Sequence, residues 1–103
     1  MNIENAKTLV GQLERLPDEK FSMNTFARHD HCGTVACIAG WCSILNGGPT
    51  GASGLISTFA SKFLGLNYIE AHRLFYSKWS YKLPFQITRA EAIAELKRMI
   101  EAA

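Results

Sequence analysis

The stretch His29-Asp-His-Cys-Gly-Thr-Val-Ala-Cys-Ile-Ala-Gly-Trp-Cys-Ser-Ile-Leu45 decides how this chain folds, and it contains all three cysteines. From Val35 to Leu45 only Gly40 and Ser43 interrupt a run of apolar residues, which predicts a helix that is buried on nearly all sides. The preceding Gly33-Thr34 offers a flexible approach and a hydroxyl N-cap, so we expect this helix to begin at about Thr34. It should form the centre of the core.

Amphipathic helices are predicted on both sides of this central helix. Apolar residues recur at three- and four-residue spacing in segments 3–15, 55–64, 68–76 and 89–101. Asn67 with Glu70, and Thr88 with Glu91, have the spacing of capping boxes at the start of the last two segments. The pattern predicts an all-α fold, a compact single domain over residues 1–103 with about five helices around the buried central helix and no sheet.

Composition and charge narrow the class of protein. Of 103 residues, 48% are hydrophobic and 19% are charged, which is typical of a globular domain, and the net charge of +2 is too small to indicate nucleic-acid binding by itself. The chain has neither an apolar run long enough to span a membrane nor the features of a secretory signal at its N-terminus. Three cysteines, an odd number, favour free thiols in a reducing compartment. We therefore expect a cytoplasmic protein.

The cysteines and histidines raise the question of a metal site or a thiol enzyme. On a helix, Cys37 and Cys42 point about 140° apart and cannot share one tetrahedral ion, so we interpret them as small core side chains. Whether His29, His31 and Cys32 converge on a ligand is left open by the spacing. Cys32 is a candidate reactive thiol, because it precedes the predicted helix N-terminus and has histidines nearby. The favoured interpretation has no metal, no cofactor and no catalytic residue. On this interpretation we expect that the chain is not an enzyme.

Residues 60–74 have the order of a helix-turn-helix, with a Leu64-Gly-Leu corner between two helical segments. We expect the second helix to face the core through Ile69, Leu74 and Phe75, which would leave few side chains to read a DNA base. Nucleic-acid binding is therefore the alternative function, not the first.

Four large aromatic residues, Tyr76, Trp79, Tyr81 and Phe85, lie within ten residues in a stretch that lacks helical periodicity. Such residues in a connecting segment either cover a core or contact a partner. We predict that they contribute to a protein–protein surface, including that of a homodimer.

One resemblance covers most of the chain. It is carried by Leu16-Pro-x-x-x-Phe21-x-Met23, Cys32-Gly-Thr-x-x-Cys-x-x-Gly-Trp41, Leu64-Gly-Leu, Glu70-Ala-x-x-Leu-Phe75 and Ile87-Thr-x-x-Glu-Ala92. This frame resembles a family of small uncharacterised bacterial and phage proteins. The resemblance implies a free-standing domain associated with phages or mobile elements, and it assigns no role to any residue.

The sequence thus favours a small helical binding or regulatory module that acts through a protein partner or self-association. DNA binding through residues 60–74 is the alternative, and a thiol enzyme or metal protein centred on Cys32 is less favoured.

Overall fold

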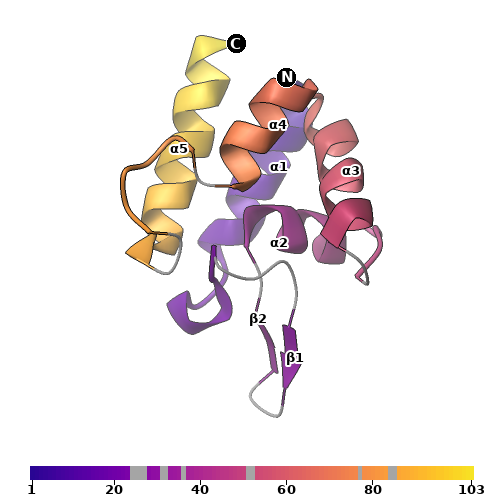
Figure 1. Ribbon diagram of the computed structural model, residues 1–103, viewed down its shortest axis with the longest axis vertical. Helices are drawn as coiled ribbons and strands as arrows, with labels where there is room; N and C mark the ends of the chain where they lie inside the picture. The colour runs from indigo at the N-terminus through magenta and orange to yellow at the C-terminus, as the bar shows by residue number, and fades with distance from the viewer. Residues whose placement is uncertain (24–27, 31–32, 36, 51–52, 77, 84–85) are drawn as a thin grey trace.

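The computed structural model describes residues 1–23, 28–30, 33–35, 37–50, 53–76, 78–83 and 86–103 (Figure 1). Over these residues the chain forms, in order, α1 (Ile3–Glu14), a 3-10 helix η1 (Asp18–Lys20), β1 (Arg28–Asp30), β2 (Gly33–Val35), α2 (Ile38–Leu45), α3 (Ser53–Leu64), α4 (Tyr68–Phe75) and α5 (Arg89–Ala102). The predicted all-α fold is therefore confirmed, with a two-stranded hairpin as its only sheet among the described residues.

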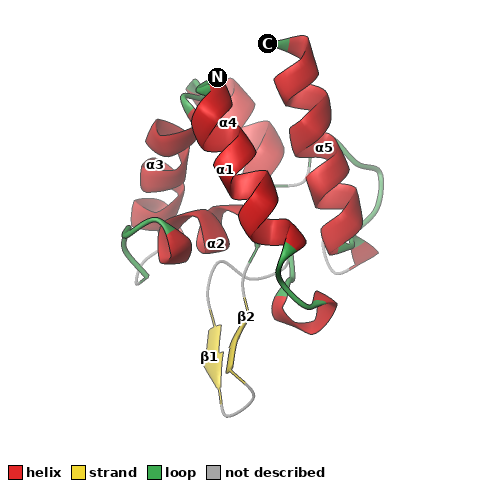
Figure 2. Ribbon diagram, turned by 180° about the vertical axis from the view of Figure 1, so that it is seen from behind, coloured by secondary structure: helices red, strands yellow, loops and turns green. Residues whose placement is uncertain are grey.

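The core forms between α2, α1 and α3 and continues between α1 and α5. Every residue from Ile38 to Ser43 is buried, as the apolar run predicts. α2 packs on α3 and α1, and α1 in turn packs along α5, as both views of the ribbon show (Figures 1 and 2). Phe21 and Met23 are also buried, so these two side chains hold the segment after η1 to the core. Among the described residues, none of the helices is both long and apolar enough to cross a bilayer.

The start of the central helix differs from the prediction. α2 begins at Ile38, with Cys37 as an extended N-cap residue, and Thr34 lies in β2. Residues 33–35 pair with residues 28–30 in an antiparallel hairpin, which projects from one end of the helical body (Figure 2). Thr34 and Val35 are β-branched and favour an extended backbone, which explains why they join a strand instead of opening the helix. The expectation of no sheet was wrong at this point.

Both ends of α1 are fixed by residues far along the chain. At its start, the Asn2 backbone N–H donates to the Leu64 carbonyl at 2.8 Å, and the Asn5 amide donates to the Phe63 carbonyl at 2.8 Å. At its end, the Arg89 guanidinium donates to the Leu13 carbonyl at 3.1 Å. Carbonyls in the last turn of a helix have no partner within that helix, so these bonds satisfy the C-termini of both α3 and α1. They lock α3 and α5 against α1.

Candidate functional site

The cysteine-rich stretch divides between the core and the hairpin. Cys37 and Cys42 are free thiols with exposures of 1% and 0%. His29 lies in β1, where its backbone pairs with that of Thr34. Cys32 and His31 lie outside the described residues, so the candidate reactive thiol and its convergence with the histidines stay a prediction. Among the described residues, no group of three or more histidine, cysteine or acidic side chains could hold a metal ion.

The two described thiols are unsuited to nucleophilic chemistry. Burial raises the pKa of Cys42 to about 12. Burial also raises the pKa of Cys37, and the backbone N–H groups of Gly40 and Ala39 oppose that shift only in part. Because the thiolate is the reactive form, both side chains are protonated and inaccessible at neutral pH. The sequence interpretation of Cys37 and Cys42 as small core side chains agrees with this burial.

The predicted aromatic surface consists of residues with different environments. Trp79 is partly buried against the core, and its indole N–H donates to the Leu74 carbonyl at 3.1 Å. Tyr81, in contrast, is 99% exposed, and Tyr76 is 48% exposed at the C-cap of α4. Phe85 lies outside the described residues. Trp79 is thus a cover over the core, whereas Tyr76 and Tyr81 are accessible to a partner.

The outer face of α4 carries a row of aromatic rings that we call the α4 stripe, made of Tyr68, His72 and Tyr76. These residues are four positions apart and therefore follow one line along the helix. The rings of Tyr68 and His72 have centroids 5.9 Å apart, and those of His72 and Tyr76 are 4.7 Å apart. Tyr68 is 82% exposed. Sequence reasoning missed this stripe, although the four-residue spacing of its members was a signal that could have shown it.

The helix that carries the stripe is held by its buried face and by its N-terminal cap. Ala71, Leu74 and Phe75 are buried on the opposite side of α4, and a full capping box between Asn67 and Glu70 holds the helix start. The sequence predicted this capping box, and it is confirmed. The stripe is therefore carried by a helix that is capped at its start and buried on its opposite side.

A shallow cavity of about 190 Å³ runs beside the stripe, between α3 and α4. Three hydroxyl residues of α3 face the stripe residues across it. Each of these hydroxyls donates to a carbonyl of its own helix region: Ser57 and Thr58 to Gly54, and Ser61 to Ser57. Their oxygen atoms keep lone pairs that can accept hydrogen bonds from a partner.

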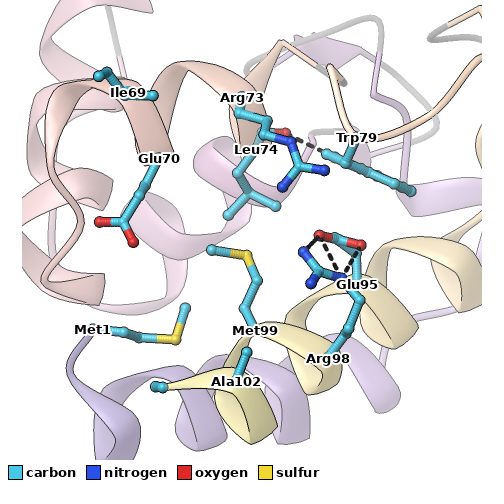
Figure 3. A pocket seen from close by; sticks show the side chains of 11 residues that line it. Met1, Ile69, Glu70, Arg73, Leu74, Trp79, Glu95, Arg98, Met99 and Ala102 are labelled. Atoms are coloured by element: carbon cyan, nitrogen blue, oxygen red, sulfur yellow. Dashed lines mark hydrogen bonds and ion pairs between the residues drawn. The ribbon is translucent and has the colours of Figure 1, made fainter.

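A second cavity, of about 370 Å³, lies on the other flank of α4, between α4 and α5 (Figure 3). We call it the α4–α5 pocket. It combines apolar side chains with two arginines and two glutamates, and it shares no lining residue with the cavity beside the stripe. Its lining is formed by Met1, Ile69, Glu70, Arg73, Leu74, Trp79, Glu95, Arg98, Met99, Ala102 and Ala103.

Helices α3 and α4 are joined by the three-residue turn Gly65–Asn67, as a helix-turn-helix requires. The Leu66 N–H donates to the Ser61 carbonyl, the Gly65 N–H donates to the Lys62 carbonyl, and Gly65 has φ +64°, which together form a Schellman C-cap. The expectation that Ile69 faces the core was wrong, because it is 76% exposed. Ile69 lies well away from the line through Ala71, Leu74 and Phe75 that marks the buried face.

Comparisons of the chain with models of protein families, with curated proteins and with solved structures found no match.

Proposed function

We propose that this chain is a protein-binding module whose partner contacts the α4 stripe. The observation that carries the proposal is the row of neighbouring rings of Tyr68, His72 and Tyr76 on the exposed face of a capped helix. Aromatic residues are enriched at protein interfaces, where they provide a large contact area. Because each ring already contacts its neighbour, a partner would have less side-chain freedom to remove on binding, which reduces the entropic cost of association.

The surface around the stripe supports a protein partner more than a nucleic acid. The exposed residues of α4 include Tyr68, Ile69 and Tyr76, whereas its only basic side chain other than the histidine is Arg73. Nucleic-acid binding depends on clustered cations that neutralise phosphates. Tyr81, at 99% exposure, adds a further aromatic residue that a protein partner can contact.

DNA binding is the second candidate, and the turn between α3 and α4 is the observation in its favour. The three-residue connection with Gly65 in the left-handed region is that of a helix-turn-helix, and it would make α4 the recognition helix. Lys62 and Arg73 are exposed on these two helices. Submicromolar binding to mixed-sequence duplex, with a steep loss of affinity as salt rises, would replace the protein-binding proposal with this one.

We also infer that the module binds without catalysing a reaction and works in a reducing compartment such as the cytoplasm. The buried, protonated state of the Cys37 and Cys42 thiols supports the first inference. The free state of the same thiols supports the second, since oxidising compartments favour disulfides.

Site-specific photo-crosslinking in the natural host tests the proposal. A benzophenone amino acid is placed at position 68, within the α4 stripe, or at exposed position 94 on α5 as a matched control. We expect a discrete crosslinked protein from position 68 and none from position 94. The same crosslinks from both positions, or none from position 68, would argue against the stripe as the partner surface.

Self-association is tested separately by sedimentation equilibrium. If the partner is a second copy, the wild type should form dimers that the Tyr68→Ala and Tyr76→Ala variants lose while keeping their helical circular dichroism. A monomeric wild type would exclude the second copy and leave a different protein as the partner.

A further inference from the structure

The α4–α5 pocket has an apolar wall. Leu74 is buried, while Met99 and Trp79 are partly buried against the core, and all three line the pocket. The bond from the Trp79 indole N–H to the Leu74 carbonyl holds the ring at the pocket edge (Figure 3). The volume of about 370 Å³ lies near the lower end of the range of about 300–1,000 Å³ found for small-molecule sites. A suitable occupant is therefore small, with one ring or a short branched chain.

Among the charged side chains that line the pocket, Arg73 is the one for which the described residues supply no partner. Arg98 donates from Nε to both carboxylate oxygens of Glu95, at 3.2 and 3.0 Å, so these two side chains neutralise each other. Glu70 accepts from the Asn67 N–H at the start of α4, where the helix dipole favours a negative charge. The Arg73 side chain makes no hydrogen bond or ion pair with any residue in the described part of the chain, and it lines the pocket beside Trp79 (Figure 3). Its guanidinium is free to bind an anion.

From this arrangement we propose that the α4–α5 pocket binds a small carboxylic acid that carries one compact apolar group. The carboxylate pairs with the guanidinium of Arg73, whose planar fork matches the two carboxylate oxygens. The apolar group lies against Leu74, Trp79 and Met99. The proposal is independent of the α4 stripe, because the cavity beside the stripe has none of the same lining residues.

The positions of the three methionines provide a direct readout of binding. Met1 and Met99 line the pocket, whereas Met23 is buried in the core and does not. The full-length protein is labelled with ¹³C at the methionine methyl groups and titrated with phenylacetate. We expect the Met99 and Met1 methyl signals to shift with a Kd below about 1 mM, typical of a ligand of this size, while the Met23 signal stays in place. The indole N–H signal of Trp79 should move as well, and that of Trp41 should not.

Two matched comparisons isolate the role of the charge. Phenylacetamide has the shape of phenylacetate without its charge, and we expect it to bind at least about tenfold more weakly. Arg73→Gln should weaken phenylacetate binding about 10–100-fold, and Lys78→Gln, which removes the same charge from an exposed side chain outside the pocket lining, should leave it unchanged. Arg73 is exposed and makes no side-chain bond within the described residues, so its variant should fold normally.

Several results would overturn the proposal. Equal affinity for phenylacetate and phenylacetamide would show that no carboxylate is recognised, and an unchanged affinity in Arg73→Gln would remove the assigned cation. Shifts of all three methionine signals together would indicate binding without a defined pocket. A titration to about 10 mM that moves none of them would show that the pocket takes no such ligand.

Discussion

Helices α2 and α4 have the same length of eight residues and opposite roles. In α2 six consecutive residues, from Ile38 to Ser43, are buried, and the N-cap residue Cys37 makes no side-chain capping bond. In α4 only Ala71, Leu74 and Phe75 are buried, and the helix begins with a complete capping box. A helix of two turns is unstable alone, so each needs support from outside its own backbone.

The comparison shows two ways to supply that support. Packing around its first six residues stabilises α2, which therefore needs no cap and has little surface left for a partner. Caps and one buried line of residues stabilise α4, which leaves most of its surface to present the aromatic stripe on one flank and to line the α4–α5 pocket on the other. A short helix that carries a binding surface is thus expected to depend more on its caps than a buried one does.

The largest contrast is expected from truncating one isoleucine in each helix. Ile38 of α2 is fully buried, so Ile38→Ala should lower the free energy of unfolding by about 2–5 kcal/mol through lost burial and a new cavity. Ile69 of α4 is 76% exposed, so Ile69→Ala should change the free energy of unfolding by less than about 0.5 kcal/mol. Urea denaturation followed by circular dichroism measures both values. Similar losses for the two variants would contradict the division between a buried and a displayed helix.

A smaller contrast is expected from two glycines at helix ends, Gly47 after α2 and Gly65 before α4. Both have positive φ, of +80° and +64°, which disfavours any side chain, but a Cβ at Gly47 would meet open space. A Cβ at Gly65 would lie 2.7 Å from the Asn2 backbone nitrogen and would displace the start of α1. We expect Gly65→Ala to cost about 2–4 kcal/mol and Gly47→Ala about 1–2 kcal/mol, measured by thermal and urea unfolding. Equal costs would mean that the contact between α1 and the α3–α4 turn adds nothing to stability.

Alkaline pH should weaken the α2 region through its thiols. The pKa of Cys42 is raised to about 12 in the folded protein from an ordinary value of 9.0, so the unfolded chain loses this proton first as pH rises. Stability should be unaffected by this thiol below pH 9 and should then fall by about 1.4 kcal/mol per pH unit up to pH 12. Urea denaturation at pH 8, 9 and 10 measures the loss. The loss of unfolding free energy per pH unit should be smaller in Cys42→Ala. An identical loss in that variant would show that the Cys42 thiol is not its source.

The smallest effect is expected from the cap of α4. Asn67→Ala removes the acceptor for the Glu70 N–H, a bond of 2.8 Å, and should cost about 1 kcal/mol. Asn67→Ser retains a capping oxygen and should recover most of that loss. Hydrogen exchange of the α4 amides measures the local effect. Unchanged exchange in Asn67→Ala would show that packing alone holds α4, as it does α2.

Much of this fold follows from local signals in the sequence. Both capping boxes form at their predicted residues because a capping bond joins groups only three positions apart. The buried position of α2 follows from its apolar run. The start of α2 did not follow, because Thr34 suits both a helix cap and a strand, and pairing with His29 across the hairpin decides between them.

The candidate sites were harder to predict because they depend on contacts between separate segments. Trp79 and Tyr81 are both aromatic and only two residues apart, yet one covers the core and the other is exposed. No periodicity distinguishes them, because the segment is not helical. The α4–α5 pocket needs Arg73 and Met99 to meet across two helices, which no local pattern shows. The α4 stripe, by contrast, was encoded locally in the spacing of its three residues.

The long-range bonds of α1 have a consequence for how the chain acquires its structure during synthesis. The Arg89 guanidinium reaches the Leu13 carbonyl across a sequence separation of 76 residues, and α1 packs most extensively on α5. Among the described helices α1 comes first in the chain and α5 last, so their contact can form only after the residues between them have been synthesised. Until then the apolar residues Leu9 and Leu13 of α1 are open to chaperones or to other nascent chains. Contacts between residues so far apart in the sequence slow folding. We therefore expect this domain to fold more slowly than a helical bundle whose contacts are mainly local.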